Sequence, residues 1–258
     1  MRRETAVFMG KIAQEDAPPV TRIAFALAAV MALTACVEPA TMPPQAPPRE
    51  ATPDPVVAEG RRGSVTVQDF ASVVARVEPV AENVCRTQTR GANCDFLIVV
   101  DRNPRAPANA FQSLDKTGRP VLTFTVALIA DVYNEDELAF ILGHEAAHHI
   151  EGHLARAQES AQMGGLLGAV IGVAIGADAT TVQDATRLGA FVGARRFSKD
   201  HELEADRLGT VISYRAGYNP VKGAAYFTRI PDPGDSFLGS HPPNAQRIET
   251  VRRTLATL

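Results

Sequence analysis

The segment from Leu138 to His153 constrains this 258-residue chain most, because it reads LAFILGHEAAHHIEGH and contains an H-E-x-x-H sequence. On an α-helix, His144 and His148 project from one face, since four residues advance the helix by one turn plus about 40°. Both imidazoles can then bind one zinc ion, and Glu145 beside them can take a proton from a water molecule that the metal holds. The pattern is typical of metallohydrolases that cut amide bonds.

The flanking sequence predicts that this segment is helical. Asn134 is a suitable N-cap, and Glu137 follows it three residues later, as in a capping box. Apolar residues then recur with helical spacing, which predicts a buried stripe of Leu138, Ile141 and Leu142.

A second pair of histidines, His149 and His153, has the same four-residue spacing. Ile150 follows the first of them, so this pair lacks a carboxylate base. We interpret both as flanking or surface histidines.

The composition supports one good-sized hydrophobic core, because 45% of the residues are hydrophobic. The net charge of −3 argues against nucleic acid as a partner recognised through general basic charge. All six histidines lie between His144 and His241, which fits a metal site in the C-terminal half.

The N-terminus resembles a bacterial lipoprotein signal. Arg22 precedes the apolar run 23–32, and Leu33-Thr-Ala-Cys36 would be cut before Cys36, whose sulfur would carry lipid. Residues 1–35 are then the signal peptide; the alternative is a signal peptide with an incidental cysteine. Val37 favours the outer membrane by resemblance, and we expect translation to start at Val20.

Residues 36–55 are expected to be a lipidated, proline-rich tether, because positions 38–55 contain seven prolines and few large apolar residues. The folded domain is predicted to span residues 56–258.

Within that domain, Gln68–Arg86 has apolar residues at helical spacing, and Pro79 should kink or split the helix. Phe96–Val100 and Val121–Leu128 are predicted strands, and Lys116–Pro120 is a predicted turn.

Cys85 and Cys94 remain as a pair once Cys36 is lipidated. A disulfide is the favoured interpretation in an oxidising compartment, and free buried thiols or a metal pair are the alternatives.

Met163–Ala177 is uncharged, with glycines at four-residue steps from Gly164 to Gly176. One hypothesis is a helix or helical hairpin packed against the catalytic domain. Another is a mobile flap, or a surface dipping into the membrane. Fifteen residues fall short of the ~20 that a membrane-spanning helix needs.

A catalytic zinc of this type takes a third protein ligand. Glu202 and Asp206 lie one helical turn apart, so one can bind the metal while the other orients a ligand histidine. Glu204 points elsewhere on the helix, and His201 is the competing ligand.

Together these segments resemble the HtpX- and BepA-like zinc metalloendopeptidases, from about Cys85 to Arg253. The resemblance rests on Asn109-Ala-Phe111, Asp136-Glu-Leu-Ala139, His144-Glu-Ala-Ala-His148, Glu202-Leu-Glu-Ala-Asp206, Ala216-Gly-Tyr-Asn-Pro220 and His241-Pro-Pro-Asn-Ala-Gln-Arg247. The multi-helix membrane portion of HtpX is missing, so the chain resembles the periplasmic lipoprotein branch.

The resemblance implies an α+β, zincin-like metallopeptidase domain that is mostly helical with a small β-sheet. It implies one Zn²⁺ per chain, bound by His144, His148 and Glu202. It also implies that Glu145 is the base, that Asp206 supports the site, and that His241 and Arg247 lie nearby.

We therefore expect a zinc endopeptidase that cleaves unfolded or misassembled envelope proteins and is tethered by lipid in the bacterial periplasm. Val121–Leu128 would be the edge strand that pairs with substrate. His241 would stabilise the oxyanion or occupy the open zinc position. The alternative is a chaperone-like periplasmic binding protein with a latent or structural zinc site, against which Glu145 argues.

Overall fold

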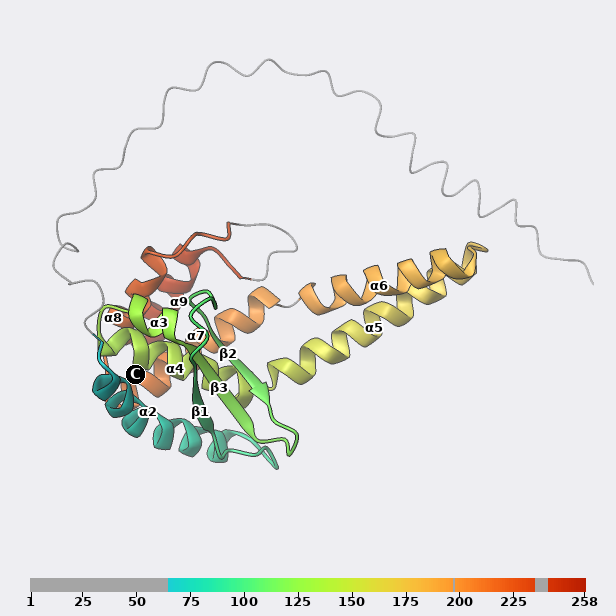
Figure 1. The fold of residues 1–258 in the computed structure, drawn as a ribbon. Coiled ribbons are helices and arrows are strands. Elements are labelled where there is room, and N and C mark those ends of the chain that lie inside the picture. The colour runs from blue at the N-terminus through green and yellow to red at the C-terminus, as the bar shows by residue number, and fades with distance from the viewer. Residues whose placement is uncertain (1–64, 197, 235–240) are drawn as a thin grey trace, which may run out of the picture. The chain divides into compact units, whose positions relative to one another are not determined.

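The computed structural model describes residues 65–196, 198–234 and 241–258, so the predicted signal peptide, Cys36 and the tether lie outside the described residues. A small three-stranded sheet lies beside a larger group of helices (Figure 1), which confirms the predicted α+β, mostly helical class. The elements in chain order are α2 (Val67–Gln88), β1 (Leu97–Asp101), β2 (Ala110–Leu114), β3 (Pro120–Thr125), α3 (Val126–Asp131), α4 (Glu135–Ile150), α5 (His153–Ala174), α6 (Ala179–Arg196), α7 (Ser198–Arg215), α8 (Pro220–Ala224), η1 (Ala225–Thr228) and α9 (Asn244–Leu255).

Helix α2 begins with a reciprocal capping box and continues through Pro79. The Thr66 N–H donates to Asp69 Oδ2 at 2.7 Å, and the Asp69 N–H donates to Thr66 Oγ1 at 3.1 Å. Of the two outcomes expected at Pro79, the helix is not split. Its buried face compensates for the missing N–H of proline. That face consists of Val73, Val77, Ala81, Val84 and Cys85.

The sheet has the strand order β1-β3-β2, with β1 parallel and β2 antiparallel to β3. Strand β1 confirms the predicted strand at Phe96–Val100, shifted by one residue. The prediction of a strand over Val121–Leu128 is wrong after Thr125, where α3 begins. The Thr125 side chain accepts a hydrogen bond from the Leu128 N–H and so caps this helix.

The edge role assigned to Val121–Leu128 is also wrong. Strand β3 is hydrogen-bonded on both sides, so it has no free edge to offer. Within the described part of the chain, β2 is the strand with an unpaired side facing the site, and the sequence did not predict it as a strand. Alternating apolar residues show that a segment is a strand but do not show whether it is central.

Helix α4 carries the H-E-x-x-H sequence and is almost entirely buried. The Asn134 side chain accepts from the Glu137 N–H at 3.0 Å, as the predicted cap requires. The helix ends at Ile150, earlier than predicted, because Gly152 adopts a left-handed conformation with φ 68°. His153 therefore begins α5 and does not share a helix with His149.

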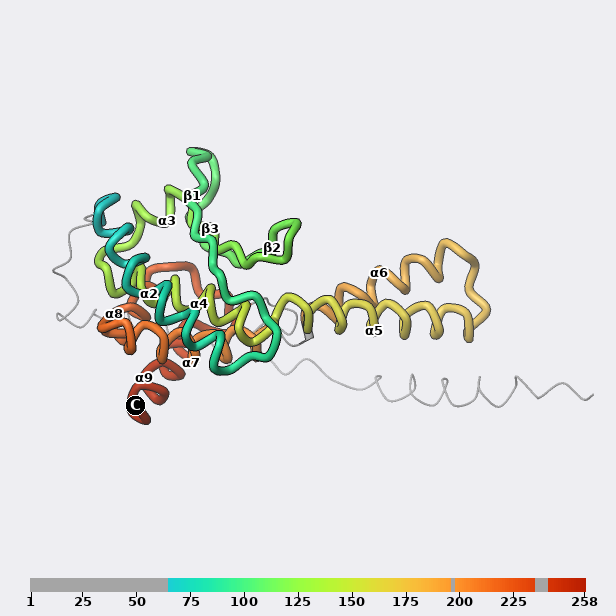
Figure 2. The backbone as a smooth tube through the Cα atoms, turned by 90° about the horizontal axis from the view of Figure 1, so that it is seen from below, coloured from blue at the N-terminus to red at the C-terminus, as the bar shows by residue number. Residues whose placement is uncertain are grey.

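Helices α5 and α6 form a hairpin, and Figure 2 shows them side by side, extending away from the remaining helices. The glycine stripe faces α6: a Cβ on Gly164 would overlap the Gly189 carbonyl, and one on Gly168 would overlap the Ala185 carbonyl. The predicted hairpin is present. It packs mainly on itself, however, and not against the catalytic domain, because α6 already covers the glycine stripe.

The opposite face of α5 is apolar and exposed. Met163, Leu166, Val170 and Val173 lie on it at helical spacing, and each side chain is more than half exposed. Among the described residues, no helix combines the length and the apolar character needed to cross a membrane.

A disulfide joins Cys85, near the end of α2, to Cys94, which precedes β1. Both cysteines are buried in the core cluster. The bond closes a short loop over a sequence separation of nine residues.

Candidate metal centre

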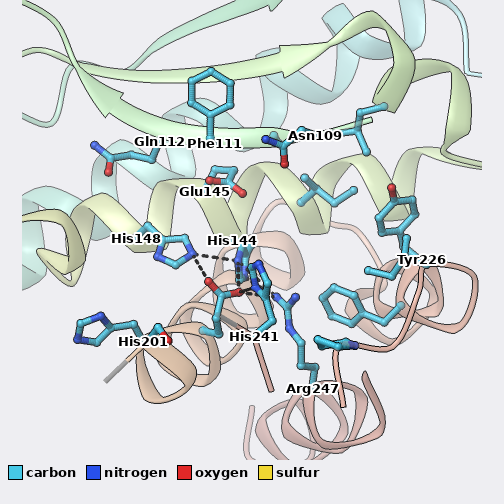
Figure 3. Close-up of a pocket in the computed structure, with 18 of the residues that line it drawn as sticks. Asn109, Phe111, Gln112, His144, Glu145, His148, His201, Tyr226, His241 and Arg247 are labelled. Carbon is cyan, nitrogen blue, oxygen red and sulfur yellow. Dashed lines mark hydrogen bonds and ion pairs between the residues drawn. The ribbon is translucent and has the colours of Figure 1, made fainter. Parts of the chain in front are cut away.

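The crossing of α4 and α7 brings two histidines and one carboxylate together (Figure 3). His144 Nε2 lies 3.0 Å from His148 Nε2 and 3.5 Å from Glu202 Oε2, and His148 Nε2 lies 3.4 Å from Glu202 Oε1. One ligating atom from each residue lies within 4.8 Å of the other two. Two imidazoles and a carboxylate form a ligand set that suits zinc and leaves a fourth position for water or substrate.

The surroundings of Glu202 also fit a metal ion. Its Oε2 atom is buried and accepts no hydrogen bond from the described residues, although His241 Nδ1 lies 3.0 Å away and an Arg247 nitrogen 3.3 Å away. Burial alone would raise the pKa of Glu202, but His144, His241 and Arg247 hold it well below the usual value. The carboxylate is therefore ionised, as a metal ligand must be.

Asp206 lies on the far side of the His144 ring and is fully buried. Its Oδ1 is 3.0 Å from His144 Nδ1, and Arg247 donates two hydrogen bonds to the same carboxylate at 2.7 and 2.8 Å. This hydrogen bond places a proton on Nδ1 of His144 and turns its Nε2 lone pair towards Glu202. Of the two carboxylates considered from sequence, Glu202 faces the histidine pair and Asp206 orients one of its rings.

The two histidines of the cluster differ in basicity. Burial lowers the pKa of His144, but the neighbouring carboxylates of Asp206 and Glu202 outweigh it and raise the pKa to about 9. Burial lowers the pKa of His148 to about 3. A metal ion binds neutral imidazole, so it would displace the Nε2 proton of His144.

Glu145 lies between the histidine pair and strand β2, on the wall of a cavity of about 820 Å³. Glu145 is only 8% exposed. This burial raises the pKa of its carboxyl to about 7, and the nearby charge of Glu202 contributes to the increase. A carboxyl with a pKa close to neutral can both accept and return a proton.

His241 and Arg247, which the resemblance placed near the site, reach it from the C-terminal part of the chain. His241 is half-exposed at the open side of Glu202, whereas Arg247 is buried beneath it. The competing ligand His201 does not join the cluster, because its ring stacks on His153 at 4.4 Å.

Sequence reasoning missed two parts of the site. Strand β2 forms one wall, with Phe111 and Gln112 above Glu145. The Asn109-Ala-Phe111 motif was a signal for this wall, because it leads into β2. The second is His153, which is 5% exposed and hydrogen-bonds to His148, so its interpretation as a surface histidine is wrong. The four-residue spacing of His149 and His153 gave no signal for this contact, because that spacing is informative only if one continuous helix contains both residues.

A helix bearing H-E-x-x-H, a carboxylate from a second helix and an adjacent edge strand define a zincin-like metallopeptidase. The chain belongs to peptidase family M48, whose family model matches residues 68–255. It is therefore a metalloprotease, as the resemblance implied.

The chain is also similar to several proteases. It is 33% identical over 139 residues to a beta-barrel assembly-enhancing protease of Yersinia pestis, covering 49% of this chain and 29% of that protein. It is 30% identical over 120 residues to the Escherichia coli K12 protein of the same description, covering 43% and 24%. The mitochondrial metalloendopeptidase OMA1 of Saccharomyces cerevisiae is 29% identical over 168 residues, covering 61% and 46%. The chain thus spans less than a third of the bacterial relatives.

Proposed function

We propose that this chain is a zinc-dependent endopeptidase that cleaves unfolded or misassembled envelope proteins. The observation that carries the proposal is the position of Glu145, which is buried next to the three-residue cluster and open to the cavity beneath β2. The two bacterial relatives described as beta-barrel assembly-enhancing proteases support an envelope substrate.

In this proposal His144, His148 and Glu202 hold one zinc ion. The bound ion would supply a Lewis acid that polarises the scissile carbonyl and makes a water molecule more acidic. The Glu145 carboxylate would accept a proton from the water molecule that attacks the carbonyl carbon, and would then return that proton to the leaving amine. Asp206 and Arg247 keep the His144 ring in the orientation that ligation needs.

The edge of β2 suits an extended substrate better than a folded one. A strand with unpaired N–H and C=O groups can take up a segment of another chain by β-augmentation. A folded protein has few backbone groups free for such pairing. The apolar side chains lining the cavity, which would receive substrate side chains, include Leu128, Phe140, Ile141 and Phe227.

We assign His241 a role that depends on whether substrate is present. Its ring nitrogen lies 3.0 Å from Glu202, so it can donate to the oxyanion when substrate is bound. Without substrate, it can take the open position on the metal. His241→Ala would then raise activity if blocking dominates and lower it if oxyanion stabilisation dominates.

We also propose that the protein is anchored in the periplasm through lipid on Cys36, at the outer membrane. The Leu-Thr-Ala-Cys36 sequence supports this, and the exposed apolar face of α5 is compatible with a nearby bilayer. Incorporation of a labelled fatty acid into wild type but not into Cys36→Ser would support it. Equal labelling of both proteins would contradict it.

The test of the main proposal is Glu145→Gln, which keeps the shape of the side chain and removes the base. Zinc content and melting temperature should be unchanged, while cleavage of unfolded casein should fall by the ~10²–10⁴-fold typical of general acid–base catalysis. Glu151→Gln, at the end of the same helix, is the matched control and should cleave normally.

The same variant separates the protease from the chaperone-like alternative. If the chain is a binding protein with a latent or structural zinc site, the wild type and Glu145→Gln should prevent client aggregation equally well. Its wild type would also show no chelator-sensitive cleavage. Cleavage that persists undiminished in Glu145→Gln would rule out the proposed mechanism.

A further inference from the structure

Four side chains form a hydrogen-bonded series that runs from the metal cluster to the protein surface. His148 Nδ1 lies 2.8 Å from His153 Nδ1, and His153 Nε2 lies 3.0 Å from Glu204 Oε2. Arg156 then donates to Glu204 Oε2 at 2.6 Å. His153 is 5% exposed, while Glu204 and Arg156 are progressively more open to solvent.

The acceptor at the end of this series fixes the position of every proton in it. An ionised carboxylate can only accept, so Glu204 requires a proton on Nε2 of His153. A neutral His153 ring with its proton on Nε2 has an unprotonated Nδ1, which can only accept a hydrogen bond from the His148 ring 2.8 Å away. His148 must therefore donate from Nδ1, which leaves its Nε2 lone pair facing His144 and Glu202.

We propose that His153, oriented by Glu204, is the positioning residue that holds His148 in its metal-binding tautomer. The inference rests on the proposed zinc site and deepens it, because it assigns two further residues to that site. Neither residue belongs to the three-residue metal cluster from which the proposed function was argued.

The backbone between α4 and α5 makes this contact possible. His148 and His153 are five positions apart, so on a continuous helix their side chains would point about 140° apart. Gly152, with φ 68°, breaks the helix and turns the His153 ring back beneath His148. His201 stacks on the other face of that ring, at an interplanar angle of 11°.

The inferred arrangement matches the one around the other ligand histidine. His144 donates directly to Asp206, whose carboxylate is held by Arg247. His148 reaches Glu204 and Arg156 through one additional imidazole. Each ligand ring thus leads to a carboxylate that an arginine holds, which is the usual means of fixing a histidine tautomer at a metal site.

The experiment measures zinc affinity of the full-length protein by competition with a chromophoric chelator, beside the melting temperature without zinc. His153→Phe keeps the stack on His201 but removes the acceptor, and Glu204→Gln lets an amide N–H face His153 and permits the wrong tautomer. Each should weaken zinc binding by ~10–100-fold, as loss of a residue behind a ligand does. His153→Asn places an amide oxygen near the lost Nδ1 and should recover much of the affinity.

Two controls separate positioning from a general structural role. The double variant His153→Phe/Glu204→Gln should bind zinc no more weakly than the worse single variant, because both substitutions break one series. Asp200→Asn neutralises an exposed carboxylate on α7, the helix that carries Glu204, and should leave zinc affinity unchanged.

The outcomes also distinguish this inference from the proposed function. Wild-type affinity in folded Glu204→Gln, or additive losses in the double variant, would overturn the role of His153 and leave the zinc site standing. Wild-type protein that binds no zinc would overturn both. Glu204 is partly exposed and its substitution isosteric, so that variant remains informative even if His153→Phe does not fold.

Discussion

Gly143 and Gly209 face each other where α4 crosses α7: a Cβ on Gly143 would lie 2.9 Å from the Gly209 carbonyl oxygen. A Cβ on Gly209 would in turn lie 2.8 Å from the backbone nitrogen of His144. Only glycine at both positions allows the two backbones to approach this closely. The contact is adjacent to His144, so it sets the distance between the histidines of α4 and Glu202 of α7.

Gly209→Ala should therefore damage both the fold and the metal site. Crowding in a packed interior costs about 1–3 kcal/mol, which exceeds the gain of about 1 kcal/mol that alanine brings to a helix. We expect a lower melting temperature and weaker zinc binding, measured by thermal unfolding and chelator competition. A melting temperature that rises, as helix propensity alone would dictate, would contradict this account of the crossing.

Glu202→Ala and Asp206→Ala should fail in different ways, because only Glu202 belongs to the three-residue cluster. Glu202→Ala should lose most of its zinc on dialysis. Asp206→Ala should retain a site weakened by ~10–100-fold, because His144 loses its hydrogen-bond acceptor. Metal analysis beside peptide cleavage checks both. Full zinc occupancy in Glu202→Ala would transfer the third ligand to another residue, and His241, 3.0 Å from Glu202, would be the candidate.

Removing zinc should destabilise the whole domain and not only the site. The cluster joins α4 to α7, and an ion that binds the folded state stabilises it by about 2.7 kcal/mol at a hundred times its dissociation constant. The melting temperature should fall on chelation and recover when zinc is restored. If chelation lowered the melting temperature of Glu202→Ala by as much as that of wild type, the chelator would be acting at another place than this site.

Loss of the disulfide between Cys85 and Cys94 should lower stability without affecting the chemistry. Closing a loop of about ten residues contributes roughly 2–3 kcal/mol on the chain-entropy model. The double variant Cys85→Ser/Cys94→Ser should unfold at a lower denaturant concentration and cleave peptide at the wild-type rate below its transition. Alkylation of unreduced wild type followed by intact-mass analysis should find neither thiol free.

The α5–α6 hairpin should respond very differently to alanine at two nearby glycines. A Cβ on Gly168 would overlap the Ala185 carbonyl, whereas one on Gly165 would meet Ala190 and Thr186 at an ordinary 3.5 Å. Gly168→Ala should separate the helices and increase proteolytic cleavage within the hairpin, while Gly165→Ala should not. Equal resistance of the two variants would mean that the glycine stripe does not hold the hairpin together.

The sequence by itself determined the features that arise within one element. The Asn134 cap, the apolar stripe and the four-residue spacing of His144 and His148 all follow from the geometry of a single helix. The same local geometry placed Glu202 and Asp206 on one face of α7. Family M48 membership also followed from such short motifs, since each holds its residues at fixed offsets along the chain.

Only the tertiary structure decided which elements meet and where the chain reverses. A strand pattern does not reveal its neighbours, so the central position of β3 and the free edge of β2 emerged from pairing. One left-handed glycine, Gly152, moved His153 from an expected helix face to a buried contact with His148. Local spacing fixes directions within a helix, whereas contacts between helices depend on packing across the whole core.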